Sequence, residues 1–167
     1  MSYTGMVKSL DVPVGFQVPG ELVYDDLRAT PIERSDLSDD IRGINSSLDL
    51  IRRTRGGWPD EAVAEDDNYV DIVWHELENR EGYSYAYVVR DAEGTYLGCC
   101  YLYPMGRRVP LTDELMDHDV DASWWVTEDA YQQGYYSKVH EALGHWVDTA
   151  FPFTNPYYSN QEIPGRG

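Results

Sequence analysis

The 167-residue sequence has few basic residues, and only two of them, Lys8 and Lys138, are lysines. Thirteen lysines and arginines stand against 30 aspartates and glutamates, which gives a formal net charge of -17. Such a surface repels phosphates at long range, so the composition argues against general nucleic-acid binding. An acidic, lysine-poor chain suits a salt-rich cytoplasm, where charges are screened, although ordinary acidic proteins also have this composition.

Cysteine is also scarce, and long apolar runs are absent. Cys99 and Cys100 are neighbours in an apolar segment, where they would point to opposite faces of a strand, so we expect small core residues rather than a disulfide or metal site. No segment reaches the ~18 apolar residues of a membrane-spanning helix. The first 20 residues lack the basic and apolar regions of a signal peptide. We therefore expect a soluble, cytoplasmic protein that does not bind membranes.

The sequence lacks the common catalytic and cofactor motifs. It has no GxSxG, Walker A or dinucleotide-binding glycine pattern. His140 and His145 resemble the ligand pair of a zinc-protease helix, but a spacing of five residues places them about 140° apart around the helix. Gly144 stands where the second ligand belongs, and His75 and His118 have no convincing partners. We therefore predict no metal cofactor.

The length and the 42% hydrophobic content predict a single domain over 1–167, with an N-terminal extension (1–20) and a tail (159–167). Apolar residues at helical spacing predict three helices, with buried stripes over 37–51, 69–77 and 139–150. The middle stripe consists of Tyr69, Val73 and Leu77, widened by Ile72 and Trp74. Apolar runs between turn signals predict strands at 22–29, 83–90, 95–103, 120–126 and 151–158. The order β-α-α-β-β-β-α-β indicates an α/β or α+β domain with a mixed sheet.

The segment from Ala122 to Trp146 is the most informative part of the chain. It predicts a buried strand, a short loop with a glycine, and an amphipathic helix. A strand that leads into a helix N-terminus presents backbone amides to an anion.

This strand, loop and helix, preceded by a hairpin, resemble the GNAT superfamily of N-acetyltransferases. In that family the fourth strand is followed by a loop with the signature basic-or-Gln, x, x, Gly, x, Gly-or-Ala. Counted from Val126 as the last strand residue, Gly134 occupies the central glycine position, Tyr131 the first position and Tyr136 the last. The resemblance covers roughly Leu22 to Tyr158. It implies a GNAT-like mixed, mostly antiparallel sheet flanked by helices.

The resemblance also implies the cosubstrate and its binding residues. Acetyl-CoA would donate the acetyl group, and an amine would attack its thioester directly. Loop amides of the family hold the pyrophosphate, and fourth-strand amides polarise the thioester carbonyl. The cofactor-binding residues so implied are Trp124, Trp125, Val126, Tyr131, Gln132, Gln133, Gly134, Tyr135, Tyr136, Ser137 and Lys138. The acceptor is a small-molecule or peptide amine that the sequence does not identify.

Two side chains are candidates for proton transfer. Asp119 and Asp121 alternate onto one face of the fourth strand, and by analogy with the family Asp121 is the candidate base. Tyr157 or Tyr158 lies where many members have a tyrosine that protonates the thiolate, and Tyr158 is the candidate acid. The alternatives are solvated edge carboxylates and tyrosines that only pack.

The chain departs from the family in two places. Tyr136 stands where a glycine or alanine lets phosphates approach the backbone, and only about 17 residues follow the last helix, which is consistent with a homodimer. One alternative is therefore a catalytically inactive GNAT-like module for ligand sensing or protein interaction. Another is an unrelated α/β domain, which predicts no splay between the strands at Tyr101 and Trp125. Arg107 and Arg108 fit either an acidic substrate or a solvated loop.

Overall fold

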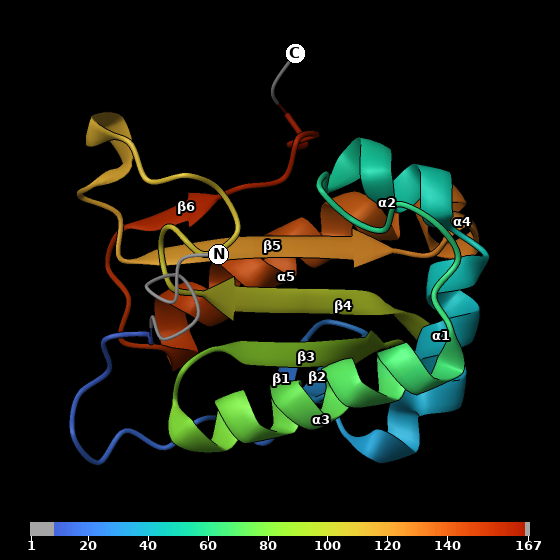
Figure 1. Ribbon diagram of the computed structural model, residues 1–167, viewed down its shortest axis with the longest axis horizontal. Coiled ribbons are helices and arrows are strands. Elements are labelled where there is room, and N and C mark those ends of the chain that lie inside the picture. The colour runs from blue at the N-terminus through green and yellow to red at the C-terminus, as the bar shows by residue number, and fades with distance from the viewer. Residues whose placement is uncertain (1–8, 166–167) are drawn as a thin grey trace.

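The computed structural model describes residues 9–165, in which six strands form one sheet with helices on both faces (Figure 1). The strands lie side by side in chain order, and each pairs antiparallel with the next except β5 and β6, which are parallel. They are β1 (Leu22–Tyr24), β2 (Leu27–Pro31), β3 (Tyr85–Arg90), β4 (Tyr96–Tyr103), β5 (Val120–Val126) and β6 (Pro156–Tyr158). The helices are α1 (Leu37–Asn45), α2 (Leu48–Thr54), α3 (Glu65–Glu81), α4 (Glu128–Gln132) and α5 (Tyr135–Ala150). This architecture confirms the predicted fold class.

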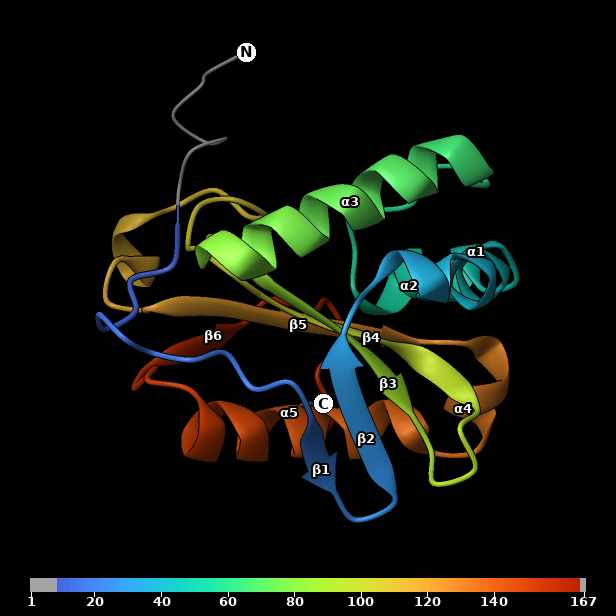
Figure 2. The same ribbon diagram turned by 90° about the horizontal axis from the view of Figure 1, so that it is seen from below.

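Two hydrophobic cores lie on the two faces of the sheet. Figure 2 shows α5 against one face and α1, α2 and α3 against the other. Because successive strand residues point to opposite faces, Trp124 is buried on the α5 side while Trp125 is buried with Ile72 on the other side. Cys100 is buried on the α5 side and Cys99 on the other side, which confirms the predicted core positions on opposite faces. Within the described residues, no helix is long and apolar enough to cross a membrane.

The predicted last helix is confirmed as α5. Its buried residues recur at helical spacing, and they are Tyr136, Val139, Ala142, Leu143, Trp146 and Val147. Gly134 precedes the helix with φ +88°, a conformation that other residues rarely adopt, and redirects the chain between α4 and α5. The short helix α4 is absent from the sequence-based prediction. The Thr127 hydroxyl caps its start by accepting a hydrogen bond from the Ala130 amide (3.2 Å).

Two predicted elements are each divided in the structure. The strand expected over 22–29 folds back on itself: it spans β1, a turn at Asp25, where φ is +51°, and the first part of β2. The helix expected over 37–51 breaks between α1 and α2. There the Ser46 hydroxyl donates to a carbonyl three residues earlier (3.1 Å), and Ser47 leaves the helical conformation. Serine side chains compete in this way with helical backbone hydrogen bonds, a local effect that apolar spacing does not reveal.

The predicted buried face of α3 is confirmed for Ile72 and is wrong for Tyr69 and Trp74. Tyr69 and Trp74, which the apolar pattern assigns to it, are 41% and 55% exposed. The buried residues are Asn68, Ile72 and Glu78. Asn68 donates a hydrogen bond to a carboxylate of α1, and Glu78 accepts one from a serine just before β3. Buried polar groups require such partners, so polar contacts and not apolar spacing orient this helix.

The sheet opens between β5 and β6 and not between β4 and β5. Strands β4 and β5 pair without interruption from Gly98 opposite Val126 to Tyr103 opposite Asp121, so there is no splay at Tyr101 and Trp125. The β5–β6 pairing, in contrast, ends at Ala122 and Tyr158, while β5 continues to Val126. Beyond Ala122, the edge of β5 that faces away from β4 therefore pairs with no strand of the described residues.

Candidate functional site

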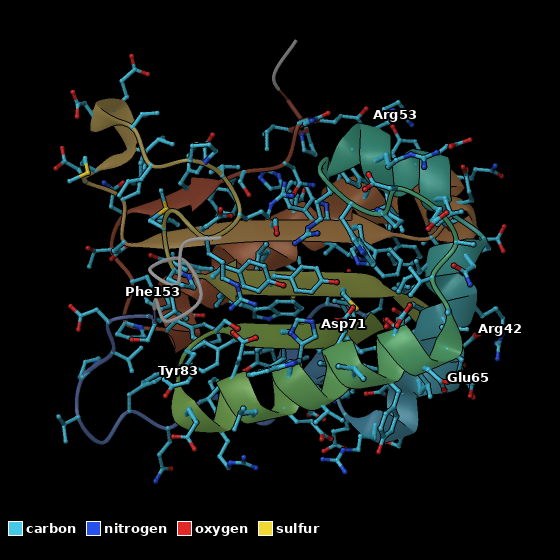
Figure 3. The ribbon with its side chains drawn as sticks, in the orientation of Figure 1. Arg42, Arg53, Glu65, Asp71, Tyr83 and Phe153 are labelled. Carbon is cyan, nitrogen blue, oxygen red and sulfur yellow. The ribbon has the colours of Figure 1, made fainter. Side chains whose placement is uncertain are left out.

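A cavity of about 320 Å³ lies between α3 and the sheet. Side chains from α1, α3, β4 and the loops after α2 and β4 line it, which makes it the meeting point of the elements that cover this face. The lining includes Ile32, Asp40, Ile44, Arg55, Gly57, Trp58, Asn68, Asp71, Ile72, His75, Tyr101, Tyr103, Arg107 and Arg108. Figure 3 labels Asp71 on α3, above the sheet. The volume suits a small organic molecule.

Arginines form one end of the cavity. Arg55 is 5% exposed, its guanidinium lies 4.3 Å from the ring centre of Tyr101, and its Nε donates to the hydroxyl of Ser123 on β5 (3.1 Å). Arg108 donates to the carbonyls of Arg55 (2.6 Å), Gly56 and Ser159. These acceptors are neutral, so neither guanidinium is held by a hydrogen-bonded carboxylate among the described residues.

Asp121 is the carboxylate that acts on both of these arginines. It is fully buried on β5, where its Oδ1 accepts from the Ser159 hydroxyl and its Oδ2 has no partner within residues 9–165. Burial raises the pKa of Asp121, while Ser159, Arg108 and Arg55 act in the opposite direction. Burial and the charge of Arg55 lower the pKa of Arg108 to about 10. Two cations thus share one buried anion at this end of the cavity.

Carboxylates form the other end. Asp40, on α1, is 4% exposed and accepts hydrogen bonds from the Tyr96 hydroxyl (2.6 Å) and the Asn68 amide (2.8 Å). Burial raises the pKa of Asp40. Asp71 is exposed at the rim, and its pKa is raised by partial burial and by the charges of Asp67 and Asp40. Carboxylates that repel each other in this way favour a cation nearby.

His75, on α3, also lines the cavity. Its Nδ1 is buried and has no partner among the described residues, and its ring centre is 6.0 Å from that of Tyr101. Burial lowers the pKa of His75 to about 4, so the ring is neutral at pH 7. Arg107, in contrast, is paired with Glu78 and lies 4.3 Å from the ring centre of Tyr103.

Sequence reasoning missed most of this cavity. Asp40, Asn68 and His75 each lie one helical turn from an isoleucine of a buried stripe, so a polar residue on an apolar helix face is the signal that would have found them. Arg55 was interpreted only as a cation at a helix end.

The cofactor-binding residues implied by the family resemblance lie at the other end of β5. Gly134 and the neighbouring Gln132 and Gln133 are exposed, and Gly134 is the residue from which α5 begins. The first turn of α5 carries no acidic residue. The amides of this turn are oriented as an anion site requires.

The chain itself covers part of this region with the C-terminal segment (Ser159–Ile163). The Asn160 side chain accepts from the backbone amide of Trp124 (3.1 Å) and donates to the carbonyl of the same residue (2.9 Å). It also donates to the Tyr136 hydroxyl (2.8 Å). Asn160 therefore occupies the free edge of β5 at one of the residues whose backbone is predicted to polarise a thioester.

Further contacts hold the C-terminal segment in place. The Tyr136 hydroxyl donates to the carbonyl of Glu162, and the Tyr131 hydroxyl donates to the Glu162 carboxylate (2.9 Å). Arg53 pairs with the same carboxylate (2.6 Å), and the Glu162 amide donates to Thr54 of α2 (2.9 Å). Tyr136 thus points into the protein, where its ring packs 5.0 Å from that of Trp124.

The last cofactor candidate, Lys138, is engaged elsewhere. Its ammonium pairs with Asp25 (2.7 Å) and Asp26 in the β1–β2 turn, and these carboxylates raise its pKa. Tyr135 donates to Asp26 as well (2.9 Å). Ser137 is exposed in the first turn of α5.

The structure separates the two catalytic candidates. Asp121 points to the face that carries the cavity, whereas Tyr158 packs against α5, where its ring is 5.4 Å from that of His140. Of the alternatives, Asp119 accepts from the backbone amides of residues 154 and 155, and the ring of Tyr157 lies 5.3 Å from that of His118. Within residues 9–165, no group of three or more His, Cys, Asp or Glu side chains is arranged to hold a metal ion.

Comparison with known proteins identifies the family. A family model described as an acetyltransferase (GNAT) domain matches residues 26–159. This overturns the alternative of an unrelated α/β domain. The absence of a splay at Tyr101 and Trp125 was expected to indicate an unrelated domain. This criterion was wrong, because it named the β4–β5 pair, and the sheet opens between β5 and β6. No curated protein matches the sequence.

Solved structures of acetyltransferases have a similar fold. A ribosomal-protein-S5-alanine acetyltransferase from Vibrio fischeri has a TM-score of 0.58 at 10% identity, over 78% of this chain and 68% of that one. A ribosomal L7/L12 alpha-N-protein acetyltransferase in complex with coenzyme A has a TM-score of 0.57 at 13% identity, over 80% and 68%. A variant of a spermidine N-acetyltransferase from Vibrio cholerae has a TM-score of 0.52 at 16% identity, over 81% and 70%. At these identities the likeness is one of fold. With a family match over most of its length and the same fold in known members, this chain belongs to the GNAT family of acetyltransferases.

Proposed function

We propose that the protein transfers the acetyl group of acetyl-CoA to an amine bound in the cavity between α3 and the sheet. The observation that carries this proposal is that Arg55, which lines the cavity, donates a hydrogen bond to Ser123 of β5. The side chains of Ser123 and Trp125 point to the cavity face, and the backbone between them belongs to the stretch that the family uses at the thioester. An amine in the cavity would therefore approach the thioester across this strand.

The residues present fit a coenzyme A pyrophosphate at the start of α5. The exposed glycine and a first turn whose own sequence holds no acidic residue favour an anion, although Asp25 and Asp26 contact Tyr135 and Lys138 nearby. Binding of the thioester portion requires a change in the chain. The Asn160 side chain must release the backbone of Trp124 before another group can bind there, so we propose that cosubstrate binding displaces part of the C-terminal segment.

The two proton-transfer roles are assigned to opposite faces of the sheet. Asp121 is proposed to assist loss of the ammonium proton on the cavity side, through Ser159 or a water. Tyr158 is proposed to protonate the leaving thiolate on the α5 side. Because the acceptor and the cosubstrate approach β5 from different sides, the separation of these side chains is compatible with their roles. The carboxylates of Asp40 and Asp71 would attract the ammonium form of the acceptor.

The test is release of the coenzyme A thiol from acetyl-CoA in the presence of a panel of primary amines, with mass spectrometry of the product. We expect acetylated amine and a fall of at least tenfold in kcat for Tyr158→Phe, which removes only the hydroxyl. Glu141→Gln, at an exposed position on α5 that does not line the cavity, is the control. Hydrolysis without acetylated amine, or no turnover with any amine, contradicts the proposal.

The alternative is an inactive GNAT-like module for ligand sensing or protein interaction. The hydrogen bonds of Asn160, Tyr136 and Glu162 favour it, because they satisfy within the chain the groups that a cosubstrate would use. Such a module would bind amines in the cavity without binding acetyl-CoA. Ligand binding measured with each compound alone therefore separates the two functions.

A further inference from the structure

The arginine end of the cavity holds more positive than negative charge, although the chain as a whole is acidic. The chain carries a net charge of -17, yet Arg55 and Arg108 lie together beside a single buried carboxylate, that of Asp121. The neighbouring Arg107 is already neutralised by Glu78, and His75 is neutral. Burial of an excess cation is costly unless a partner compensates for it.

Arg55 is the residue with unused hydrogen-bond donors. Its Nε is bound to Ser123, but within the described part of the chain its two terminal nitrogens donate to no acceptor. The guanidinium is fixed by packing on the ring of Tyr101 and lines the cavity although only 5% of the residue is exposed. Arg108, in contrast, uses all three of its nitrogens on neutral groups. A fixed guanidinium with two free nitrogens is suited to bind a carboxylate through paired hydrogen bonds.

We propose that Arg55 binds a carboxylate of the acceptor, so that the acceptors are small amino carboxylic acids. This inference rests on the proposed function, since it names the substrate class of the same cavity. The cavity carries both charges that such a zwitterion needs: the guanidinium of Arg55 would meet the carboxylate, and Asp40 and Asp71, which line the same cavity, would favour the adjacent ammonium group through their charge. The volume of about 320 Å³ is suited to a molecule of amino-acid size.

The walls of the cavity are suited to an apolar substrate side chain. Trp58, Tyr101 and Tyr103 provide aromatic surface, and Ile32 and Ile72 provide aliphatic surface. An apolar or aromatic side chain would bury against them while both charged groups are paired. A simple alkylamine would leave Arg55 uncompensated, and the cavity should discriminate against it.

The experiment compares amines that differ only in the carboxylate. The probes are L-phenylalanine against 2-phenylethylamine and L-leucine against 3-methylbutylamine, each titrated calorimetrically into the full chain without acetyl-CoA. We expect the amino acid of at least one pair to bind roughly tenfold to hundredfold more tightly than its amine. Arg55→Gln should remove this preference while leaving the affinity for the amine unchanged. Arg55→Lys, which keeps the charge but loses the paired geometry, should retain only part of it.

Arg42→Gln is the matched control, because it removes one arginine charge from an exposed position on α1 outside this cavity. It should preserve the preference. Three results would overturn the inference. The first is equal affinity within both pairs, and the second is binding of no probe. The third is an equal loss of affinity for the amino acid and its amine in a folded Arg55→Gln protein. Preferential binding of an amino acid that is never acetylated would support the carboxylate site and contradict only the proposed function.

Discussion

The two sides of β5 differ in how completely their polar groups are paired. On the cavity side, Arg55 has free donors and the buried Nδ1 of His75 and Oδ2 of Asp121 lack partners within the described residues. On the α5 side, the backbone of Trp124 is fully bonded to Asn160, which is bonded in turn to Tyr136. One region presents unused hydrogen-bonding groups to a ligand, and the other uses its groups within the chain.

This difference has a consequence for the order of binding events. A ligand in the cavity adds hydrogen bonds without breaking any, so the cavity is preformed for the acceptor. A cosubstrate at β5 must exchange its bonds for those of Asn160, so part of its binding free energy is spent on displacing the C-terminal segment. Substitutions that change the hydrogen bonds or ion pairs on the two sides of β5 should therefore differ in their effects on the free energy of unfolding and on ligand affinity.

The largest effect is expected from Asp121→Ala. It leaves Arg55 and Arg108 without the one carboxylate beside them, and loss of one partner of a buried charge cluster costs about 3–5 kcal/mol. The free energy of unfolding, measured by urea denaturation, should fall by about this amount. Glu141→Ala, exposed on α5, should change it by less than about 0.5 kcal/mol. A similar small change in both proteins would show that the cavity charges are solvated.

The next largest effect is expected in the pH dependence of stability, through His75. Its pKa is about 4 in the folded protein against an ordinary value of 6.5, so the unfolded chain binds the proton first as the pH falls. The contribution of neutral His75 to stability is present above pH 6.5 and is lost between about pH 6.5 and 4. His75→Gln should abolish about 2 kcal/mol of this acid destabilisation. Urea denaturation at pH 7 and pH 4.5 measures it, and an identical pH dependence in both proteins would place the ring in solvent.

A smaller effect is expected from Asn160→Ala. It frees the backbone of Trp124 on the α5 side, so the affinity for acetyl-CoA should rise by roughly tenfold although stability falls by about 1–2 kcal/mol. Calorimetric titration with acetyl-CoA measures the affinity. The exposed neighbour Gln161 provides the control as Gln161→Ala. A loss of affinity in Asn160→Ala would mean that Asn160 contacts the cosubstrate and is not displaced by it.

The smallest effect is expected from Lys138→Met. Its ammonium is already paired with Asp25 and Asp26, so it has little charge to offer a pyrophosphate. The dissociation constant for acetyl-CoA should change by less than about threefold at moderate salt. A loss of tenfold or more would show that Lys138 leaves these aspartates and binds the phosphates, as the family resemblance implies.

Regular patterns in the sequence predicted the parts of the fold that depend on apolar burial. The stripe of Val139, Leu143 and Trp146 and the alternation through Trp124 and Trp125 are such cases, because apolar burial alone fixes those faces. The orientation of α3 and the break between α1 and α2 depend on individual polar contacts. Apolar periodicity carries no information about these contacts.

The candidate site was predicted only in part for the same reason. The start of α5 was found because a glycine in a strand-to-helix loop has a local signature, and Gly134 indeed has a positive φ. The cavity groups Asp40 and His75 come from two helices and Arg55 from the residue after a third, so they meet only after folding. No spacing in the sequence records that Asn160 reaches the backbone of Trp124 36 residues earlier.

The most direct test of the account is calorimetric titration of the protein with acetyl-CoA and with coenzyme A, at low and at molar salt. The account predicts binding in the micromolar range, tighter in Asn160→Ala than in the unchanged protein. Binding should persist at molar salt, where the repulsion between the acidic surface and the phosphates is screened. No binding heat at either salt, in either protein, would contradict the proposed acetyl transfer.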